Sequence, residues 1–367
     1  MRHVCLIDFT PIHYFCGSYR ILFMDKKVLV IKLGTAIISN DAGNISIKVI
    51  EKLAKEIAGL SQHYHVVIVS SGAVGSGKAF VKNYEGTLTQ RKAAAAVGNP
   101  ILIRLYHKYF YKYGITVAQA LCERHHFANR QQFLQLKETF EEFWRNNIVP
   151  VVNENDLVSN VELKFSDNDE LATLISVGFN ADILVICTKS GGLLNADKNI
   201  IPIVQKIDAV TFGHVTKDKS HTGLGGMLSK LTSAKLAVSL GIKVVICGLD
   251  GRTPISDAIE GKKGTTFSPR QSNLKARQKW LASGSISPGS IAIDDGAFKA
   301  LQLRKSLLAV GIKEVNGNFI AGEVVQLLTN QGESIGVAKS KLSSAELATK
   351  PSLRNTVAAH ADDIVLF

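Results

Sequence analysis

The chain has 367 residues, of which 46% are hydrophobic and 20% charged, so it is long enough for two domains and apolar enough to bury a core. This composition excludes an intrinsically disordered chain, and no apolar run of the sequence is long enough to span a bilayer. The net charge of +12 favours anionic partners such as a nucleotide, an acidic substrate or nucleic acid, without choosing among them.

The chain before Met24 is predicted to lie outside the fold. Residues 1–23 are apolar but interrupted by charged residues and a proline, so they make a poor signal peptide. The cysteines form no C-x-x-C pair, and Cys187 and Cys247 fall within apolar strand-like runs, where reduced core thiols are expected. These features predict a cytoplasmic protein whose fold begins near residue 24.

Strands and helices alternate through most of the chain. Short runs rich in β-branched residues predict strands at 28–33, 65–70, 115–121, 148–152, 182–188 and 242–247. Apolar residues at helical spacing predict helices at 45–60, 90–113, 129–146, from 169 onward and at 229–240. In the second of these helices, Gly98-Asn99-Pro100 predicts a break. The alternation predicts an α/β domain over residues 24–272, a three-layer αβα sandwich with a mainly parallel central sheet.

The pattern changes after Phe267. Residues 273–289 carry basic residues and Ser-Gly-Ser, which predict a linker. Beyond it, shorter runs joined by glycine turns predict strands at 311–315, 317–319, 322–327 and 362–366. Residues 290–367 are therefore predicted to form a small, β-rich second domain.

Polar residues gather where the strand at 148–152 ends. Asn153-Glu154-Asn155-Asp156 follows that strand at once, and Ser166-Asp167-Asn168-Asp169 opens the next predicted helix. In open α/β sheets, ligands bind beyond the carboxyl ends of the strands. A solvated turn with Asp and Asn caps is the simpler alternative. Two such clusters in succession, flanking a buried strand, favour a site for a polar ligand.

Three glycine-containing loops are candidates for binding phosphate, at residues 32–35, 70–78 and 223–230. The second has the spacing of a P-loop from Gly72 to Lys78, but Ala79 stands where a P-loop needs a hydroxyl for Mg²⁺. A tight turn is expected there instead, or a loop in which Ser71 and the following backbone bind a substrate carboxylate.

The first and third loops carry Lys32 and Lys230, and the third opens a helix. Two lysines at two strand or helix ends can face each other across a transferring phosphoryl group, whose oxygens carry the charge. Asp167 and Asp169 are then expected to orient both lysines or to bind Mg²⁺, a cation that prefers oxygen ligands.

Together these motifs resemble the amino acid kinase family. The stretches that carry the resemblance are 32–35, 69–73, 94–98, 148–156, 167–169 and 225–227, and the tail at 313–319 and 322–324 resembles a PUA domain. The resemblance runs in matching order from about residue 24 to 367. It implies the amino acid kinase fold, ATP and Mg²⁺ as cofactors, and phosphorylation of the γ-carboxylate of L-glutamate, the first step of proline biosynthesis.

The resemblance also implies roles for individual residues. The residues implied to carry the phosphoryl transfer are Lys32, Lys230, Asp169 and Asp167. The residues implied to bind glutamate are Ser71, Asp156 and Asn168. The residues implied to contact ATP are Lys32, Thr188, Lys189, Leu224, Gly225, Gly226, Met227, Leu228, Ser229 and Lys230. Asp156 would bind the glutamate ammonium group, because a charge-assisted hydrogen bond is stronger than a neutral one.

The chain departs from the family pattern on the nucleotide side. Lys189 stands where an aspartate is common, and Leu224 and Leu228 stand where Thr and Ser are usual. These changes remove polar groups near the nucleotide and bear on ATP affinity and base preference more than on the reaction.

Further expectations concern partners. The resemblance implies inhibition by proline and a homo-oligomer. Three alternatives stay open at this point: a kinase of the same fold acting on another carboxylate or a carbamate, an RNA-binding or regulatory protein, and an inactive sensor of glutamate or proline. The basic charge and the PUA resemblance motivate the RNA alternative, although the tail lacks the aromatic-rich basic stripe that base stacking needs.

Overall fold

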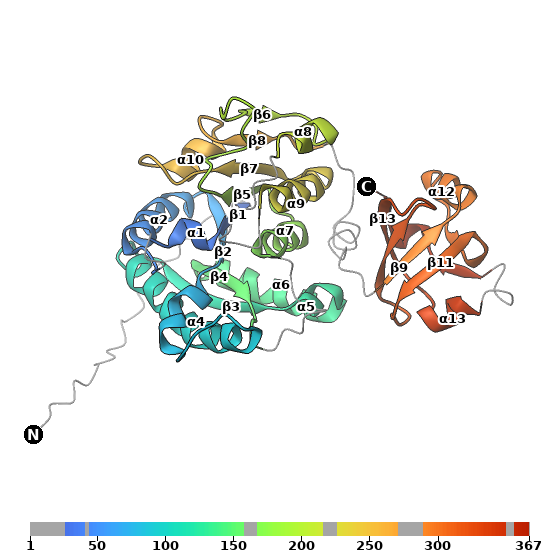
Figure 1. Ribbon diagram of the computed structural model, residues 1–367, viewed down its shortest axis with the longest axis horizontal. Coiled ribbons are helices and arrows are strands. Elements are labelled where there is room, and N and C mark those ends of the chain that lie inside the picture. Colours follow the sequence, from blue (N-terminus) through green and yellow to red (C-terminus); the bar gives the residue numbers. More distant parts are fainter. Residues whose placement is uncertain are drawn as a thin grey trace, which may run out of the picture.

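The computed structural model describes residues 26–40, 44–157, 167–215, 226–270, 289–349 and 356–366 (Figure 1). The predicted N-terminal extension and residues 273–288 of the predicted linker lie outside the described residues, as do Leu224 and Gly225. Of the helices that the structure describes, none is long and apolar enough to cross a membrane.

The first part of the chain builds a sheet with the strand order β3-β4-β2-β1-β5-β7-β8-β6. Its strands are β1 (Lys27–Leu33), β2 (Tyr64–Ser70), β3 (Thr116–Cys122), β4 (Ile148–Glu154), β5 (Ile183–Cys187), β6 (Ile203–Val204), β7 (Lys243–Cys247) and β8 (Thr265–Phe267). The pairings along it are parallel except that β8 runs antiparallel to β7. The prediction of a mainly parallel sheet is confirmed.

Helices cover both faces of this sheet (Figure 1). They are α1 (Thr35–Ile38), α2 (Ile47–Leu60), α3 (Ala73–Gly77), α4 (Leu88–Tyr111), α5 (Arg124–Ala128), α6 (Arg130–Arg145), α7 (Asn168–Gly178), α8 (Ala209–Gly213), α9 (Met227–Ser239) and α10 (Pro254–Ile259). Because successive side chains of a strand point to opposite faces, each central strand contributes side chains to two hydrophobic cores, one on each face of the sheet. On β1, Val30 packs with α7 and α9, whereas Leu29 and Ile31 pack with α2 and α4. The three predicted layers are confirmed.

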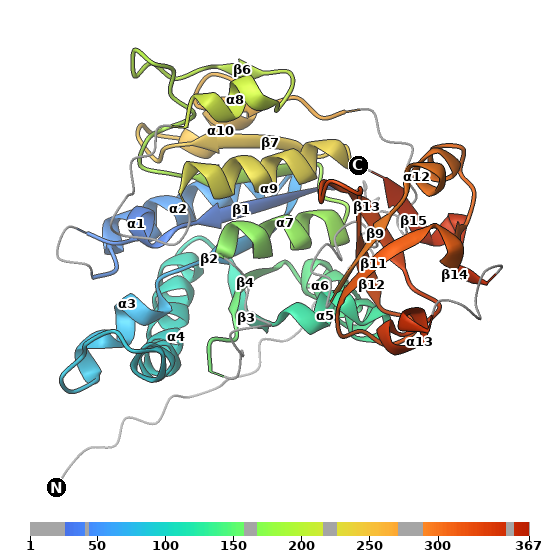
Figure 2. The ribbon, with the colours of Figure 1, turned by 45° about the vertical axis from the view of Figure 1, so that its right-hand side comes forward.

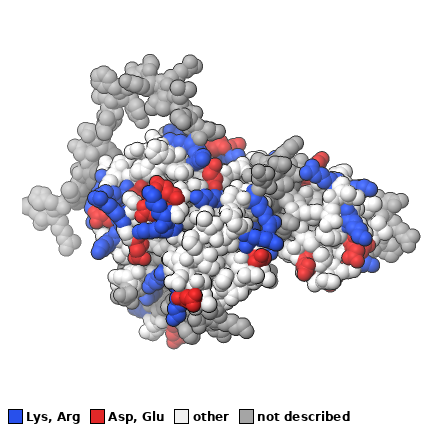
Figure 3. Space-filling model, turned by 90° about the horizontal axis from the view of Figure 1, so that it is seen from above, with Lys and Arg blue, Asp and Glu red and all other residues white. Residues whose placement is uncertain are grey.

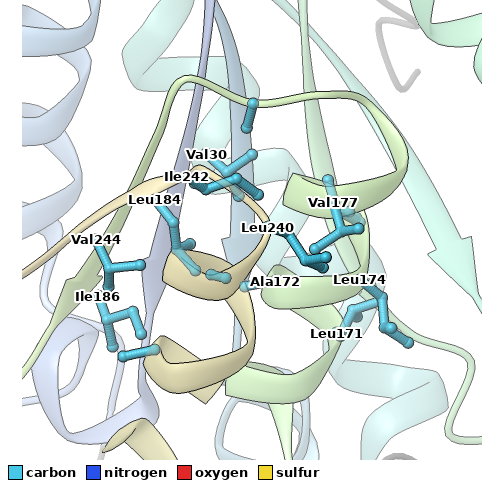
Figure 4. Close-up of a cluster of buried hydrophobic side chains, with 14 of the residues drawn as sticks. Val30, Leu171, Ala172, Leu174, Val177, Leu184, Ile186, Leu240, Ile242 and Val244 are labelled. Carbon is cyan, nitrogen blue, oxygen red and sulfur yellow. The ribbon is translucent and has the colours of Figure 1, made fainter. Parts of the chain in front are cut away.

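A large cluster of buried hydrophobic side chains fills the core between the sheet and the helices α7 and α9 (Figure 4). Leu171, Leu174 and Val177 of α7 belong to the same buried cluster as side chains of β1, β5 and β7. Figure 2 shows the two helices lying side by side along the strands. This packing fixes the position of the first turns of α7 and α9, which carry most of the candidate site residues.

The second domain has its own sheet and core. The strands are β9 (Gly289–Ile293), β11 (Ile312–Gly317), β12 (Val324–Leu328), β13 (Ser334–Lys339) and β15 (Ile364–Leu366), in the order β11-β9-β12-β13-β15, with a separate pair of β10 (Leu307–Leu308) and β14 (Val357–Ala359). Helices α12 (Asp295–Gln302) and α13 (Ser344–Ala348) were not predicted. Ile291, Phe319 and Leu327 are among the side chains of its core. The predicted small β-rich domain is confirmed.

The predicted reduced core thiols are confirmed. Cys187 and Cys247 are free and buried, and they lie opposite each other on β5 and β7. The neighbouring Cys247 thiol and burial hold the pKa of Cys187 well above its usual value. The Cys187 thiol therefore stays protonated, and both buried side chains pack as small apolar groups.

The predicted helix break at Gly98-Asn99-Pro100 is wrong. Helix α4 runs from Leu88 to Tyr111 with Pro100 inside it. A proline removes one intrahelical hydrogen bond, but tertiary packing holds this helix together across it. Gly98 allows a close helix crossing instead, because the backbones of α3 and α4 approach each other closely at this point. A Cβ atom added at Gly98 would lie 1.7 Å from the carbonyl oxygen of Ala73.

Replacing Gly98 by alanine is expected to lower the free energy of unfolding by about 1–3 kcal/mol or more, because the added methyl group forces the two helix backbones apart. Gly59→Ala is the matched control. Gly59 also lies in a helix, α2, but a Cβ atom there meets nothing within 4 Å. The control should gain about 0.5–1 kcal/mol. Urea unfolding of both variants measures the difference, and equal stability of the two would refute the close crossing.

A buried carboxylate connects α2 to α10. The Glu56 Oε1 atom accepts hydrogen bonds of 2.8 Å from the backbone N–H groups of Ile255 and Ser256 at the start of α10. The Oε2 atom is buried, with no hydrogen-bond partner among the described residues. Burial raises the pKa of the Glu56 carboxyl above its ordinary value of 4.5.

Because the folded-state pKa of Glu56 is raised, its ionised form destabilises the fold at neutral pH, and this destabilisation disappears as the pH falls through the raised pKa toward 4.5. Glu56→Gln keeps an acceptor for α10 and removes the charge. We expect its free energy of unfolding at neutral pH to equal or exceed that of the unmodified chain, with the difference shrinking in acid. Glu56→Ala should lose about 1–3 kcal/mol. Urea unfolding across this pH range tests both, and equal destabilisation by Gln and Ala would contradict the expectation.

Candidate active site

The carboxyl ends of several parallel strands lie side by side at one edge of the sheet. Leu33 at the end of β1 is opposite Ser70 of β2 on one side and Cys187 of β5 on the other. The residues that follow these ends are therefore neighbours, although they are far apart in the sequence. This edge holds Lys32, Ser71 and Thr188, as expected for an α/β ligand site.

The centre of the site is a buried cluster of three charges. The Lys32 Nζ atom lies 2.6 Å from Asp169 Oδ1, and the Lys230 Nζ atom lies 3.0 Å from Asp169 Oδ2. Asp169 is fully buried, and the two lysines are 5% and 6% exposed. Burying these charges is unfavourable unless they pair with each other. Because two ammonium groups share one carboxylate, positive charge exceeds negative charge within the cluster, which suits an anionic ligand.

The first turn of α7 presents the acidic residues of the cluster. Asp167 is the N-cap, and its Oδ1 atom accepts hydrogen bonds from the backbone N–H groups of Asp169, at 2.9 Å, and Glu170, at 3.1 Å. Its Oδ2 atom accepts a hydrogen bond from the Ser229 hydroxyl of α9. The helix starts at Asn168, one residue before the predicted start. Asp167 thus connects the two helices that carry Asp169 and Lys230.

Helix α9 brings its amino-terminal end to the same place. Gly226 is the N-cap, and it carries no side chain that could occupy the first backbone N–H groups. Lys230 lies in the first turn, with its side chain on Asp169, whereas Leu228 is 58% exposed. The positive end of the helix dipole adds to the positive charge of the lysines.

Neutral amides extend from the charged cluster to the strand ends. The Asn168 side-chain nitrogen donates to the Ser71 hydroxyl at 2.8 Å and to the Asn153 side-chain oxygen at 3.1 Å. The Asn153 nitrogen in turn donates to the Asn99 oxygen of α4 at 3.2 Å. Because Ser71 accepts a hydrogen bond from Asn168, its own hydroxyl hydrogen is directed elsewhere and can be donated to a ligand.

Strand β4 is longer than predicted. It continues through Asn153 and Glu154, both buried, so the polar loop starts at Asn155. The ladder to β3 continues to the end, with Glu154 opposite Cys122. Backbone pairing with a neighbouring strand explains why polar residues remain in a strand that the apolar pattern ended at 152. Asp156 follows, half-buried.

Three side chains that support Ser70 and Asn168 had no individual role in the prediction. Asn153 and Asn99 continue the amide chain, and the buried Tyr106 hydroxyl lies 2.8 Å from the Ser70 hydroxyl. Burial raises the pKa of Tyr106 well above its ordinary value, so its hydroxyl stays protonated. Ser70, Asn99 and Asn153 line a small cavity together with Gln119. The polar run that starts at Asn153 was a usable signal for that residue, but nothing in the sequence pattern indicated Tyr106.

Thr188 and Lys189, which were predicted to contact ATP, follow the end of β5. The Thr188 backbone N–H donates to the Cys247 carbonyl oxygen at 2.8 Å, and the Thr188 hydroxyl is 3.5 Å from that of Ser190. Lys189 is exposed. The structure thus brings Lys32, Asp169 and Lys230 into contact, while the contacts described for Thr188 stay within the end of β5 and its neighbour β7.

Among the residues that the structure describes, no group of three or more His, Cys, Asp or Glu side chains could hold a metal ion. Both oxygens of Asp169 face lysines, and Asp167 accepts hydrogen bonds at both oxygens. The carboxylates of the site therefore orient protein groups, and the predicted option that they bind Mg²⁺ directly finds no support in this donor set.

Comparison with known proteins gives a consistent result. The sequence pattern of the amino acid kinase family matches residues 27–248, and that of the PUA domain matches residues 289–353. The chain is 38% identical to glutamate 5-kinase of Aquifex aeolicus, over 92% of this chain and 99% of the relative. It is 33% identical to glutamate 5-kinase of Aliivibrio fischeri, over 93% of this chain and 99% of the relative. Among solved structures, carbamate kinase of Giardia superposes with a TM-score of 0.49 at 17% identity, over 67% of this chain and 100% of that one.

Proposed function

The chain belongs to the amino acid kinase family, among the glutamate 5-kinases, and from this premise we propose how its residues carry out the reaction. The activity is ATP-dependent phosphorylation of the γ-carboxylate of L-glutamate to L-glutamyl 5-phosphate, the first step of proline biosynthesis. The observation that carries the assignment of roles is the buried Asp169 carboxylate between the ammonium groups of Lys32 and Lys230.

The charged cluster is proposed to stabilise the phosphoryl group during transfer. A γ-carboxylate oxygen of glutamate forms a bond to the terminal phosphorus of ATP, and the bond from that phosphorus to the bridging oxygen breaks to release ADP. Such transfers depend mainly on positioning and on stabilising the charge of the equatorial oxygens. Lys32 and Lys230 supply that positive charge. Asp169 contacts both ammonium groups and so holds them in place before the substrates bind.

The glutamate molecule is proposed to bind at the ends of β2 and β4. The Ser71 hydroxyl, oriented by Asn168, would donate to the γ-carboxylate, and Asn168 places this contact next to the lysine cluster. The half-buried Asp156 would bind the ammonium group, since an ionised acceptor forms the stronger hydrogen bond. Both segments end at the same edge of the sheet, so one ligand can span them.

ATP is proposed to lie along the amino-terminal end of α9, with its phosphates at the first turn and Lys230. Thr188, Lys189 and the 224–230 loop would contact the rest of the nucleotide. Mg²⁺ is proposed to bind chiefly to phosphate oxygens and water, its usual mode with nucleotides, since the carboxylates of the site contact protein groups. The ion would neutralise phosphate charge while the chain's own residues orient the phosphoryl group.

Regulation, assembly and location are proposed as well. Inhibition by proline at the glutamate site and a homo-oligomer are proposed from the family resemblance. The free, buried thiols of Cys122, Cys187 and Cys247 support a reducing, cytoplasmic location. The RNA-binding alternative is not favoured, and basic and acidic side chains are interspersed on the face drawn in Figure 3. A kinase for another carboxylate is likewise not favoured.

Trapping of the acyl phosphate tests the proposal. The purified chain is incubated with ATP, Mg²⁺ and glutamate in the presence of hydroxylamine, which converts an acyl phosphate to a coloured hydroxamate. Hydroxamate that forms only when glutamate is present is the expected result. Hydroxamate with a different acid but not with glutamate would replace the substrate, and none with any acid would overturn the kinase assignment.

A further inference from the structure

Two consecutive residues at the end of β3 contact both segments of the glutamate and phosphoryl site. One segment is the end of β4, which leads to Asp156, and the other is the first turn of α7, which carries Asp169. Glu123 and Arg124 follow β3 directly. Strand β3 pairs with β4 along its whole length, so these two residues lie next to the site although no role has been assigned to them above.

Glu123 contacts the β4 segment. Its Oε1 atom accepts a hydrogen bond of 2.8 Å from the Asn155 side-chain nitrogen. The Asn155 backbone N–H also donates to the Cys122 carbonyl oxygen at 2.9 Å, which extends the β3–β4 ladder by one residue. Asn155 is therefore held at its backbone and its side chain, immediately before Asp156.

Arg124 contacts the α7 segment. Its Nη2 atom donates to both carboxylate oxygens of Glu170, at 2.6 and 2.7 Å. The two side chains are 17% and 21% exposed, so the ion pair is largely shielded from water. Glu170 follows Asp169 in the sequence, and the contact therefore acts on the turn that presents Asp169 and Asn168.

We propose that Glu123 and Arg124 are positioning residues that fix the distance between the glutamate-binding end of β4 and the first turn of α7. The inference rests on the proposed function. The residues from 158 to 166, which join the two segments in the sequence, lie outside the described residues. The separation between the two segments is set by core packing and by side-chain contacts such as those of Glu123 and Arg124. A common contact at the end of β3 restricts that separation directly. In phosphoryl transfer, a displacement of about 1 Å can reduce the rate about 100-fold.

The two contacts have distinguishable effects. Loss of the Arg124 contact moves the turn that carries Asp169, which acts in the transition state, so kcat should fall about 10- to 100-fold. Loss of the Glu123 contact moves the segment that binds ground-state glutamate, so the KM for glutamate should rise several-fold with a smaller change in kcat. Because a single nitrogen of Arg124 donates to both carboxylate oxygens of Glu170, a lysine ammonium can replace the guanidinium in part.

The experiment compares Arg124→Leu, Arg124→Lys, Glu123→Ala and Glu123→Gln with the unmodified chain. Steady-state kinetics give kcat and KM, and amide hydrogen exchange reports on peptides covering 153–157 and 168–173 without any substrate. We expect Leu and Ala to cause the kinetic changes above together with faster exchange confined to those peptides, and Lys and Gln to restore most of both. Glu170→Gln breaks the same contact from the other side, should Arg124→Leu fail to fold.

The matched control is Lys112→Leu, which breaks the 2.7 Å ion pair with Glu51 on α2, a pair of exposed side chains. It should leave kcat, KM and exchange in the site peptides unchanged. Arg124→Leu that behaves like this control would overturn the proposal, and so would faster exchange throughout the domain without rescue by lysine. Failure of the proposed function would be seen separately, as an unmodified chain that forms no glutamate-dependent hydroxamate while the exchange results still stand.

Discussion

Replacing Lys230 by alanine is expected to lower kcat about 1000-fold while the KM for glutamate changes by less than about twofold. The Lys230 ammonium lies 3.0 Å from Asp169 and contributes half of the positive charge of the lysine cluster. A group that acts on the equatorial oxygens of the phosphoryl in transfer stabilises the transition state more than the bound substrates. Its loss should therefore appear in kcat rather than in glutamate binding.

Lys235→Ala is the control for Lys230, because Lys235 lies on the same helix, α9, but is exposed. It should leave both kinetic constants within about twofold of the unmodified chain, as is usual for an exposed substitution. Initial rates at varied glutamate and ATP measure both variants. A Lys230→Ala variant with normal kcat and a raised KM for glutamate would show that Lys230 binds glutamate rather than the phosphoryl group.

Asp169→Asn is expected to affect both catalysis and stability. Asparagine has nearly the same shape but no charge, so the ammonium groups of Lys32 and Lys230 would remain buried near each other without a counter-ion. Removing one partner of a buried ion pair lowers the free energy of unfolding by about 3–5 kcal/mol. We also expect kcat to fall at least about 100-fold, because the lysines lose the group that orients them.

Urea unfolding and the hydroxamate rate together measure the Asp169→Asn effect. Asp182→Asn serves as the control, since Asp182 is exposed and its Oδ2 atom accepts one hydrogen bond of 2.9 Å from the backbone N–H of Val28. Asparagine can keep that bond, so the control should lose less than about 1 kcal/mol and no activity. Unchanged stability and rate in Asp169→Asn would mean that the lysines do not depend on this carboxylate.

Most of the central sheet could be predicted because its strands are buried on both faces and read as continuous apolar runs. The ends were harder to predict. Asn153 and Glu154 are polar, yet they stay in β4 because backbone pairing with β3 continues there. Short elements such as β6 and β8 have too few residues for any periodicity to be detected. Pro100 indicated a helix break that tertiary packing prevents.

The candidate site was only partly predictable from the residue pattern. The two clusters after residue 152 indicated a polar site, and their roles came from the family resemblance. The pairing of Asp169 with Lys230 spans 61 positions of sequence, and local patterns cannot specify a contact at that distance. The same holds for Asn99 and Asn153, 54 positions apart, and for Arg124 and Glu170, 46 apart. These contacts exist only because the fold packs α7 against α9 and brings the ends of β3 and β4 close to α4 and α7.

The amide chain from Asn99 through Asn153 and Asn168 to Ser71 contains no group that gains or loses a proton in the physiological range. Its hydrogen-bond directions are therefore the same in mildly acidic and mildly alkaline solution. A substrate contact made through Ser71 keeps its geometry across that range. Any acid or alkaline limb in a plot of activity against pH must then arise from the ionisable groups around the chain or from the substrates themselves.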